Sequence, residues 1–440
     1  MTRRGAGEDH RRPAPHRRAR RLLEEPVSRS VLFVNLRRIK REGQEALLAA
    51  RALGYRVVVL GRALPAFAEP LVDSFHQVDT YDTERSVKLA RELAAEHDIA
   101  GVPNFTEVDV RLVSAIATDL GLPALPAEAA LAARNKYVMK QAISGKVDVL
   151  PAYERVTDLA GLRAAVERIG LPAVVKPTGA SGSKGIFELR SEADLEPAMT
   201  ELLRIADPGF DPVFQQFGAE FIVEEYLDGV ELSVEGFVAA GQVHVVGITD
   251  KVTTDPFHLE LTHRFPSALP TDAQATISRQ AGEVVRALGF DNCAFHLEAK
   301  WGERGMRFLE VAARPAGDYI GSHLVPAATG IPFFENVIRV ATGEPLRLTP
   351  DRDLHAGLRF VLAGSAGTYA GLDGVAELVD APGYDHVFTE VPVGAAVKLP
   401  PADFGSQRVA AVCARHVHRA GLDALLDAVP EVVTARVTAG

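Results

Sequence analysis

Short apolar runs alternate with helical segments at the start of the ordered chain, and this alternation constrains the fold more than any other feature. The runs at 31–35 and 56–60 have the length and composition of buried parallel strands, and the segment 44–53 between them has the pattern of a helix that ends at Gly54. A crossover helix between two such strands is typical of a βαβ unit. We therefore expect order to begin near Ser30.

The alternation continues beyond this first unit. A helix over 83–96, a strand near 99–103 and a helix over 108–120 are expected, and Gly121 closes the last helix, as glycine commonly does. We predict an open α/β domain over residues 30–125.

The rest of the chain mixes strands and helices without this regular order. One alanine-rich helix is expected through Asn135, Lys136 and Lys140, and further helices at 159–169, 273–288, 333–342 and 407–428. Strands are expected at 173–176, 221–225, 231–239 and 243–249, with a hairpin of 295–300 and 306–312. The predicted division is an extension over 1–29, the α/β domain over 30–125, a core of two α+β lobes over 126–349 and a small α/β lid over 350–440.

Residues 1–29 are rich in arginine and contain three prolines and few large apolar side chains. Such a segment cannot bury enough apolar area to fold, so we expect a disordered extension. A nucleic-acid-binding tail or a targeting peptide is the alternative. The net charge of the whole chain is −10, which argues against nucleic acid as the main partner.

No stretch approaches the ~18 consecutive apolar residues of a membrane-spanning helix, and the start of the chain lacks the pattern of a secretory signal. The two cysteines, Cys293 and Cys413, form neither a disulfide framework nor a zinc pattern, so we expect two buried small apolar side chains. A cytoplasmic location without a membrane partner fits this usage. A homodimer is left open.

A buried strand ending in Lys176 leads directly into a loop rich in glycine and serine. Glycines let backbone N–H groups approach phosphate oxygens closely, and lysines supply the countercharge. The spacing is neither that of a Walker A loop nor that of a Rossmann fingerprint, and taken alone it also suits a mobile surface hairpin. The candidate phosphate-binding residues are Lys176, Ser181, Gly182, Ser183, Lys184 and Gly185.

Two acidic residues and an aromatic–apolar pair follow the apolar run 221–223. After a phosphate-binding loop, such a segment favours a purine hinge, in which backbone groups pair with the purine edge and a carboxylate holds ribose hydroxyls. A hairpin with solvent-facing acids is the alternative. The candidates are Glu224, Glu225, Tyr226 and Leu227, with Glu231 seven residues after Glu224.

Glu298 and Glu310 lie within apolar runs on the two strands of the expected hairpin. Two inward carboxylates on facing strands repel each other unless a cation bridges them, and Mg²⁺ with nucleotide phosphates is a common solution. Arg314, four residues later, can face the same metal and stabilise an oxyanion. Salt-bridged or exposed acids and an ordinary surface arginine are the alternatives.

The order of these four elements resembles the ATP-grasp superfamily, over roughly residues 30–440 and with the specific motifs between Lys136 and Arg314. The resemblance implies a combined α/β and α+β fold, the ATP-grasp fold, with an N-terminal open α/β (pre-ATP-grasp) domain and a small C-terminal lid. It also implies ATP and Mg²⁺ as cofactors, with Mn²⁺ as a substitute for Mg²⁺.

The resemblance assigns roles to residues of this chain. Lys136 and Lys176 would contact ATP phosphates, Glu224 to Leu227 would frame the adenine, and Glu231 would bind the ribose. Glu298 and Glu310 would ligate Mg²⁺. The family commonly has asparagine where Ala312 stands, so water completes the second Mg²⁺ site or that ion binds more weakly.

The stretch 248–267 resembles the substrate loop of the L-amino acid ligases, which are dipeptide synthases of the alanine–anticapsin type. Their Glu-x-x-His pair matches Glu260 and His263. By this resemblance Arg314 would stabilise the oxyanion of the reaction, and Glu260 or His263 would orient a substrate or accept the amine proton. A loop histidine with satisfied hydrogen bonds is the alternative for His263.

The function implied is that of an ATP-dependent carboxylate–amine ligase. Such an enzyme forms an amide or dipeptide from amino-acid-like substrates through an acyl phosphate and releases ADP and phosphate. One alternative is a biotin-carboxylase-like or formyl-transfer enzyme with a non-amine acceptor. The other is a catalytically inactive nucleotide-binding regulator.

Overall fold

The computed structural model describes residues 29–37, 40–182, 184–207, 209, 212–255, 257–379, 381–400, 402–403 and 405–439. Nearly all of the extension expected over 1–29 lies outside these residues, and so does Ser183. Within the described part, the strands form four sheets.

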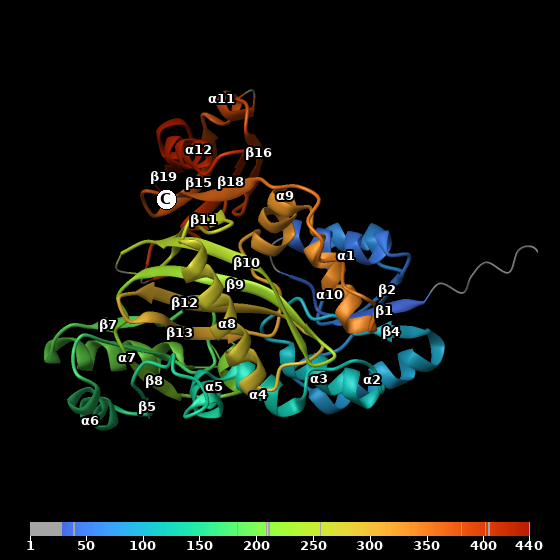
Figure 1. Ribbon diagram of the computed structural model, residues 1–440, viewed down its shortest axis with the longest axis horizontal. Helices are drawn as coiled ribbons and strands as arrows, with labels where there is room; N and C mark the ends of the chain where they lie inside the picture. The colour runs from blue at the N-terminus through green and yellow to red at the C-terminus, as the bar shows by residue number, and fades with distance from the viewer. Residues whose placement is uncertain are drawn as a thin grey trace, which may run out of the picture.

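A parallel sheet of order β3-β2-β1-β4 forms the N-terminal part of the molecule. Its strands are β1 (Ser30–Val34), β2 (Arg56–Gly61), β3 (Ser74–Gln77) and β4 (Ile99–Gly101). Its helices are α1 (Lys40–Ala52) and α10 (Phe333–Thr342) on one face and α2 (Thr83–Glu96) and α3 (Val110–Asp119) on the other (Figure 1).

The side chains of β1 alternate between these two layers, because successive residues of a strand point to opposite faces. Val31 and Phe33 pack in the cluster that contains α1 and α10, while Leu32 and Val34 pack against α2 and α3. Burying each of these side chains contributes about 1.5–3 kcal/mol. The expected βαβ alternation is present, and α10 reaches this sheet from much later in the chain.

An antiparallel sheet of order β5-β8-β6-β7 builds a small lobe. Its elements are β5 (Tyr153–Val156), β6 (Ala173–Pro177), β7 (Phe187–Leu189), β8 (Phe221–Glu225), α6 (Leu159–Ile169) and α7 (Leu195–Ile205). The two helices share a buried cluster with the sheet. The glycine-rich loop joins β6 to the edge strand β7.

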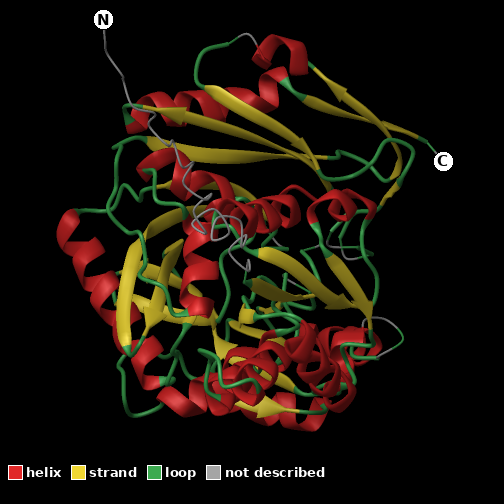
Figure 2. Ribbon diagram, turned by 90° about the vertical axis from the view of Figure 1, so that its right-hand side faces the viewer, coloured by secondary structure: helices red, strands yellow, loops and turns green. Residues whose placement is uncertain are grey.

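The largest sheet has eight strands, in the order β13-β12-β9-β10-β11-β14-β18-β16. Figure 2 shows the strands of the molecule in yellow, with helices in red packed around them. They are β9 (Val230–Ala239), β10 (Gln242–Thr253), β11 (Glu260–Phe265), β12 (Cys293–Gly302), β13 (Gly305–Ala312), β14 (His355–Leu362), β16 (Tyr384–Thr389) and β18 (Arg408–His416). Helix α8 (Thr271–Ala287) packs on the part formed by β9, β10, β12 and β13. The sheet therefore runs without a break from the expected core into the expected lid, and the division at 349/350 stays a prediction.

A small sheet of order β17-β15-β19 completes the C-terminal part. Its strands are β15 (Gly367–Asp373), β17 (Ala396–Val397) and β19 (Thr434–Thr438), and helices α9 (Val325–Thr329), α11 (Val375–Val379) and α12 (Arg419–Val432) also belong to the second half of the chain. No helix of the described residues is both long and apolar enough to cross a membrane.

The single alanine-rich helix expected through Asn135 is wrong. Asn135 has an extended backbone and separates α4 (Ala127–Arg134) from α5 (Lys136–Ile143). Its side-chain oxygen accepts hydrogen bonds from the backbone N–H groups of Tyr137 and Val138 at 2.9 and 3.0 Å. Asparagine is a strong helix N-cap because it satisfies these otherwise unpaired donors, so Lys136 becomes the first residue of a new helix.

The helix expected over 407–428 is also partly wrong. Residues 408–416 form β18, and α12 begins only at Arg419. The run from Val409 to Ala414 is buried throughout, because β18 lies between β14 and β16. A short, continuously apolar run does not distinguish a buried strand from a helix, and the neighbouring strands decide here.

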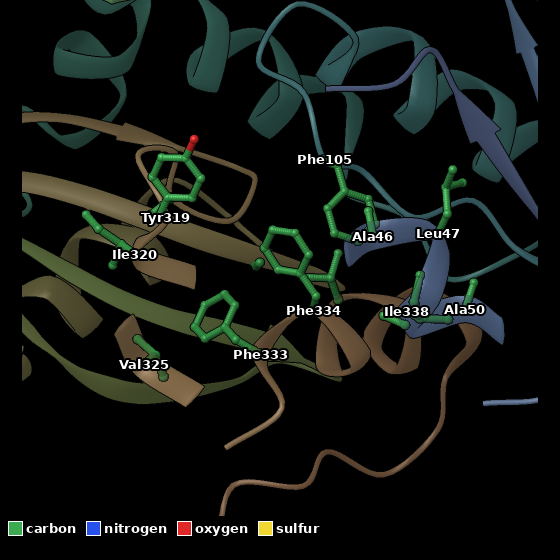
Figure 3. Packing of buried hydrophobic residues seen from close by; sticks show 14 of the residues in the cluster. Ala46, Leu47, Ala50, Phe105, Tyr319, Ile320, Val325, Phe333, Phe334 and Ile338 are labelled. Atoms are coloured by element: carbon green, nitrogen blue, oxygen red, sulfur yellow. The ribbon is translucent and has the colours of Figure 1, made fainter. Parts of the chain in front are cut away.

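The main hydrophobic cluster joins the N-terminal sheet to the eight-stranded sheet. Phe333 and Phe334 at the start of α10, Phe105 after β4 and Tyr319 point into it from different elements (Figure 3). The two cysteines are free and buried, as expected. This packing fixes the segment around Tyr319 relative to both sheets.

Candidate functional site

A cavity of about 1150 Å³ lies between the small lobe and the eight-stranded sheet, including the C-terminal strands β16 and β18 of that sheet. Its lining includes fifteen of the predicted site residues: Lys176, Ser181, Gly182, Lys184, Gly185, Glu224, Glu225, Tyr226, Leu227, Glu231, Glu260, His263, Glu298, Glu310 and Arg314. Ser183 lies outside the described residues, and Lys136 is not part of the lining. Residues predicted from separate motifs thus surround one space.

The glycine-rich loop reaches the cavity from the end of β6. Gly182 and Gly185 have φ of +70° and +73°, a region that favours glycine. A Cβ at Gly185 would also collide with Ile205 of α7. The loop can therefore pass close to the lobe and present backbone N–H groups to a bound anion.

Glu224 lies at the end of β8 between two buried lysines. Lys176 Nζ is 2.8 Å from Glu224 Oε2, and Lys140 Nζ is 3.2 Å from Oε1. Burial would raise the pKa of the Glu224 carboxyl, but the two lysines hold it below its usual value. Burial lowers the pKa of Lys140 to about 8. The segment expected to frame the adenine therefore starts with a carboxylate that positions Lys176.

Lys136 lies at the edge of the cavity. Its Nζ donates to the carbonyl oxygen of Ala180 at 2.6 Å and lies 3.0 Å from Glu310 Oε2. It thus links the glycine-rich loop of the small lobe to β13.

Glu298 and Glu310 are direct cross-strand partners in the β12–β13 hairpin. Glu298 accepts hydrogen bonds from Lys251 Nζ at 2.7 Å and contacts His296 Nε2 at 3.0 Å. Burial would raise the pKa of Glu298, but Lys251 and His296 hold it well below its usual value. Paired carboxylate oxygens are hard ligands that suit Mg²⁺ together with phosphate oxygens. Among the described residues no group of three or more candidate side-chain ligands occurs, so phosphate and water would have to complete such a site.

His296 connects the candidate metal ligand to a deeper carboxylate. Its Nδ1 lies 2.9 Å from Oε1 of Glu235, which is fully buried and also accepts a hydrogen bond from Ser233 at 2.7 Å. Burial would lower the pKa of His296, but the two carboxylates raise it to about 9. The imidazole therefore holds the side chain of Glu298 in one orientation.

Arg314 is anchored by the N-terminal part of the chain. Its Nε donates to Glu107 Oε2 at 2.8 Å, and the other oxygen of Glu107 accepts from Arg134 at 2.9 Å. The guanidinium Nη1 donates to the carbonyl of Pro315. These contacts fix the orientation of the Arg314 side chain, which lines the cavity.

Glu260 and His263 lie on β11, beside β10, which carries Lys251. Lys251 Nζ is 2.5 Å from Glu260 Oε1, so this lysine links Glu260 to Glu298. His263 is fully buried, with its Nδ1 3.9 Å from Glu260 and its Nε2 3.7 Å from Asp318. The predicted substrate loop is thus mostly strand, and it adjoins the carboxylate pair.

Sequence reasoning missed several residues of the site. Lysine is scarce here, with ten in 440 residues, and this scarcity could have singled out Lys140 and Lys251 in their apolar surroundings. The other residues gave no signal in the sequence, because distant segments bring them into contact. They are Glu107, Glu235, His296, Asp318, Glu390 and Arg408.

Comparisons with known proteins agree with this architecture. Residues 169–323 match the family model of the ATP-grasp domain, and residues 47–124 match that of the ATP-grasp N-terminal domain. This chain is an ATP-grasp protein and has the ATP-grasp fold.

Within that class, the chain resembles L-amino acid ligases. It is 32% identical over 250 residues to the alanine–anticapsin ligase of Bacillus subtilis strain 168, a match that covers 53% of this chain and about half (51%) of the relative. The L-amino acid ligase of Bacillus licheniformis superposes with a TM-score of 0.79 at 20% identity, over 94% of this chain and 100% of that one.

A carboxylase has the same fold. The biotin carboxylase domain of the Hydrogenobacter thermophilus 2-oxoglutarate carboxylase, solved with MgADP and bicarbonate, superposes with a TM-score of 0.69 at 16% identity, over 93% of this chain and 91% of that one. At such identities, structural similarity shows the fold alone.

Proposed function

We propose that this protein is an ATP-dependent ligase that joins a carboxylate to an amine, with amino-acid-like substrates, and releases ADP and phosphate. One observation carries the proposal: the facing carboxylates Glu298 and Glu310 share a cavity with the anchored Arg314 and with the Glu260–His263 pair. The residues to which we assign nucleotide binding and acyl transfer therefore line a single space.

The small-lobe end of the cavity would hold ATP. Lys176, positioned by Glu224, and the loop residues Ser181 to Gly185 would neutralise and enclose the phosphates. Tyr226 and Leu227 would frame the adenine, and Glu231 would bind the ribose. Lys136, which contacts Glu310 and the loop carbonyl of Ala180, would act at the phosphates from the edge.

Glu298 and Glu310 would hold Mg²⁺, which the fit of their paired oxygens supports. The carboxylase relative was solved with MgADP, and Mn²⁺ would substitute. Mg²⁺, when bound, offsets negative charge on the phosphates. Ala312 stands where the family commonly has asparagine, so water would occupy the ligand position that the asparagine oxygen would fill.

In the first step, a carboxylate oxygen of the acid substrate attacks the γ-phosphorus, and the bond between that phosphorus and the β–γ bridging oxygen breaks. The products are an acyl phosphate and ADP. Positioning and charge neutralisation are the main sources of rate enhancement in such transfers.

In the second step, the amine nitrogen attacks the acyl carbon, the amine loses a proton, and phosphate leaves. Arg314 would stabilise the oxyanion of the tetrahedral intermediate. Glu260 or His263 would orient the amine or accept its proton. We propose that this reaction takes place in the cytoplasm, which the two free thiols favour.

A screen of ADP release over pairs of amino acids, with mass spectrometry of the products, tests the proposal. We expect ADP release that depends on both partners and an amide as the product. Glu310→Gln keeps the shape of the side chain but removes its charge, so it should lower Mg²⁺-dependent turnover at least a hundredfold. Turnover without amide would instead support the carboxylase-like or formyl-transfer alternative, and no turnover with any pair would favour an inactive nucleotide-binding regulator.

A further inference from the structure

The part of the cavity beside Glu260, His263 and Glu390 contains buried polar atoms that lack a hydrogen-bond partner among the described residues. Glu260 Oε2, Glu390 Oε1 and both ring nitrogens of His263 are buried and have no hydrogen-bond partner among the described residues. All three residues line the cavity. An unpartnered carboxylate oxygen in a buried site is costly, so a ligand that donates hydrogen bonds is the chemistry that fits this end.

A group of charged residues extends this end toward the C-terminal strands. Asp318 accepts two hydrogen bonds of 2.9 Å from Arg408 of β18, and the guanidinium of Arg408 stacks 4.2 Å from the ring centroid of Phe360. Glu390, which follows β16, lies 3.9 Å from Arg408. Because Arg408 is paired with Asp318, the carboxyl group of Glu390 has no cation of its own among the described residues.

The other arginines near Glu390 are already paired with other carboxylates. Arg41 also lines the cavity, but its guanidinium lies 2.7 Å from Glu45. Glu42 of α1 lies near Glu390 and pairs with Arg37 at 2.8 Å. Burial raises the pKa of Glu390 to about 7, with Asp318 and Glu42 adding to the shift and Arg408 opposing it. Among the described residues, Arg408 is thus the cation that faces Glu390, at 3.9 Å, and Asp318 already pairs with it.

The surroundings of Glu390 suit an alkyl chain that ends in a cation. Tyr319 and Phe388 stack with centroids 4.5 Å apart, and Val387 and Val391 also line the cavity. Aromatic rings attract cations as well as alkyl groups. Asp318 and Tyr319 have consecutive positive φ values of 52° and 64°, and such backbone conformations in non-glycine residues concentrate at functional sites.

We propose that this wall, formed by Asp318, Tyr319, Phe388, Glu390 and Arg408, binds the cationic side chain of one substrate, with Glu390 as the carboxylate that contacts it. The substrate class is a basic amino acid with an aliphatic ammonium side chain. The proposal rests on the proposed ligase function and specifies its selectivity.

L-Lysine and L-norleucine test it, because they have the same aliphatic backbone and differ by the terminal ammonium group. Binding of each to the full-length protein with Mg²⁺ and a non-hydrolysable ATP analogue is measured by calorimetry at pH 8. We expect lysine to bind at least tenfold more tightly than norleucine. Glu390→Gln should reduce this preference below about threefold, while Glu377→Gln, an exposed change on α11, should retain it.

Equal or tighter binding of norleucine to the native protein would overturn the proposal, and so would a lysine preference that survives in a folded Glu390→Gln variant. Thermal melting of each variant establishes that it is folded, and Glu390→Asp, which keeps the charge, should recover part of the preference. Binding does not require turnover. Amide synthesis from neutral amino acids without a lysine preference would contradict this inference and leave the ligase function intact. Lysine binding without amide synthesis would support this inference and contradict the ligase function.

Discussion

Lys176 is the residue through which the nucleotide prediction is most simply tested. Replacing it with methionine removes the charge opposite the phosphates, while Lys140 still balances the buried carboxylate of Glu224. The fold should therefore persist. A ligand that binds only the native state raises the melting temperature, and we expect Lys176→Met to lose most of the stabilisation by ATP and Mg²⁺. Lys146→Met, an exposed change, should keep it; equal stabilisation in both variants would remove Lys176 from the phosphate site.

Glu390 gives a prediction about pH. Its pKa is raised to about 7 in the folded protein, against about 4.3 for an ordinary glutamate. The folded state therefore binds the proton more tightly than the unfolded state, and this carboxyl destabilises the ligand-free protein progressively as pH rises from about 4 to 7. Glu390→Gln should thus raise the free energy of unfolding above pH 7 by roughly 2–4 kcal/mol and leave it nearly unchanged near pH 4. Denaturant unfolding at both pH values measures this, and a variant that is destabilised at pH 8 would contradict it.

At the scale of elements, the break between α4 and α5 determines where Lys136 lies. Asn135 caps α5 and donates to Glu220 at 2.8 Å, so Asn135→Ala should cost about 0.5–2 kcal/mol and loosen the start of α5. We expect weaker ATP binding in addition to lower stability. Asp158→Ala removes the cap of α6, where Asp158 accepts from Gly161 N–H at 2.7 Å, and should lower stability alone. If the two variants affected ATP binding equally, the cap of α5 would have no special part in the site.

Much of the architecture could be predicted at this scale, because local patterns specify it. The observed limits of α2, α6, β8 and α10 agree with the limits predicted from the sequence, because caps and apolar periodicity define them. The strand β18 could not be predicted in this way, because its buried run is ambiguous until β14 and β16 are placed on either side. The break at Asn135 could have been found from its capping chemistry.

The candidate site, too, could be predicted only in part from the sequence. Motif residues such as Lys176, Glu298 and Glu310 are recognisable because each lies in a characteristic local pattern. Their supporting partners are not, because Glu107, Asp318 and Glu390 come from separate parts of the chain and meet only in three dimensions. The roles of all these residues stay predictions.

At the scale of the whole molecule, one cavity brings together the three groups of residues for which we propose roles. The small lobe contributes the loop proposed to bind phosphates, the eight-stranded sheet contributes the carboxylate pair and the Glu260–His263 pair, and its C-terminal strands β16 and β18 line the far end. A continuous series of contacts runs from Glu298 through Lys251, Glu260, His263, Asp318 and Arg408 to Glu390. The nucleotide end and the proposed substrate end are therefore parts of one electrostatic network.

The acyl-phosphate route is the central claim, and isotope transfer tests it most directly. The acid substrate is labelled with oxygen-18 in both carboxylate oxygens and turned over with ATP, Mg²⁺ and an amine partner. If the carboxylate oxygen attacks the γ-phosphorus, one labelled oxygen must leave with the phosphate, so mass spectrometry should find one oxygen-18 per released phosphate and one in the amide. Productive turnover that gives unlabelled phosphate would contradict the account.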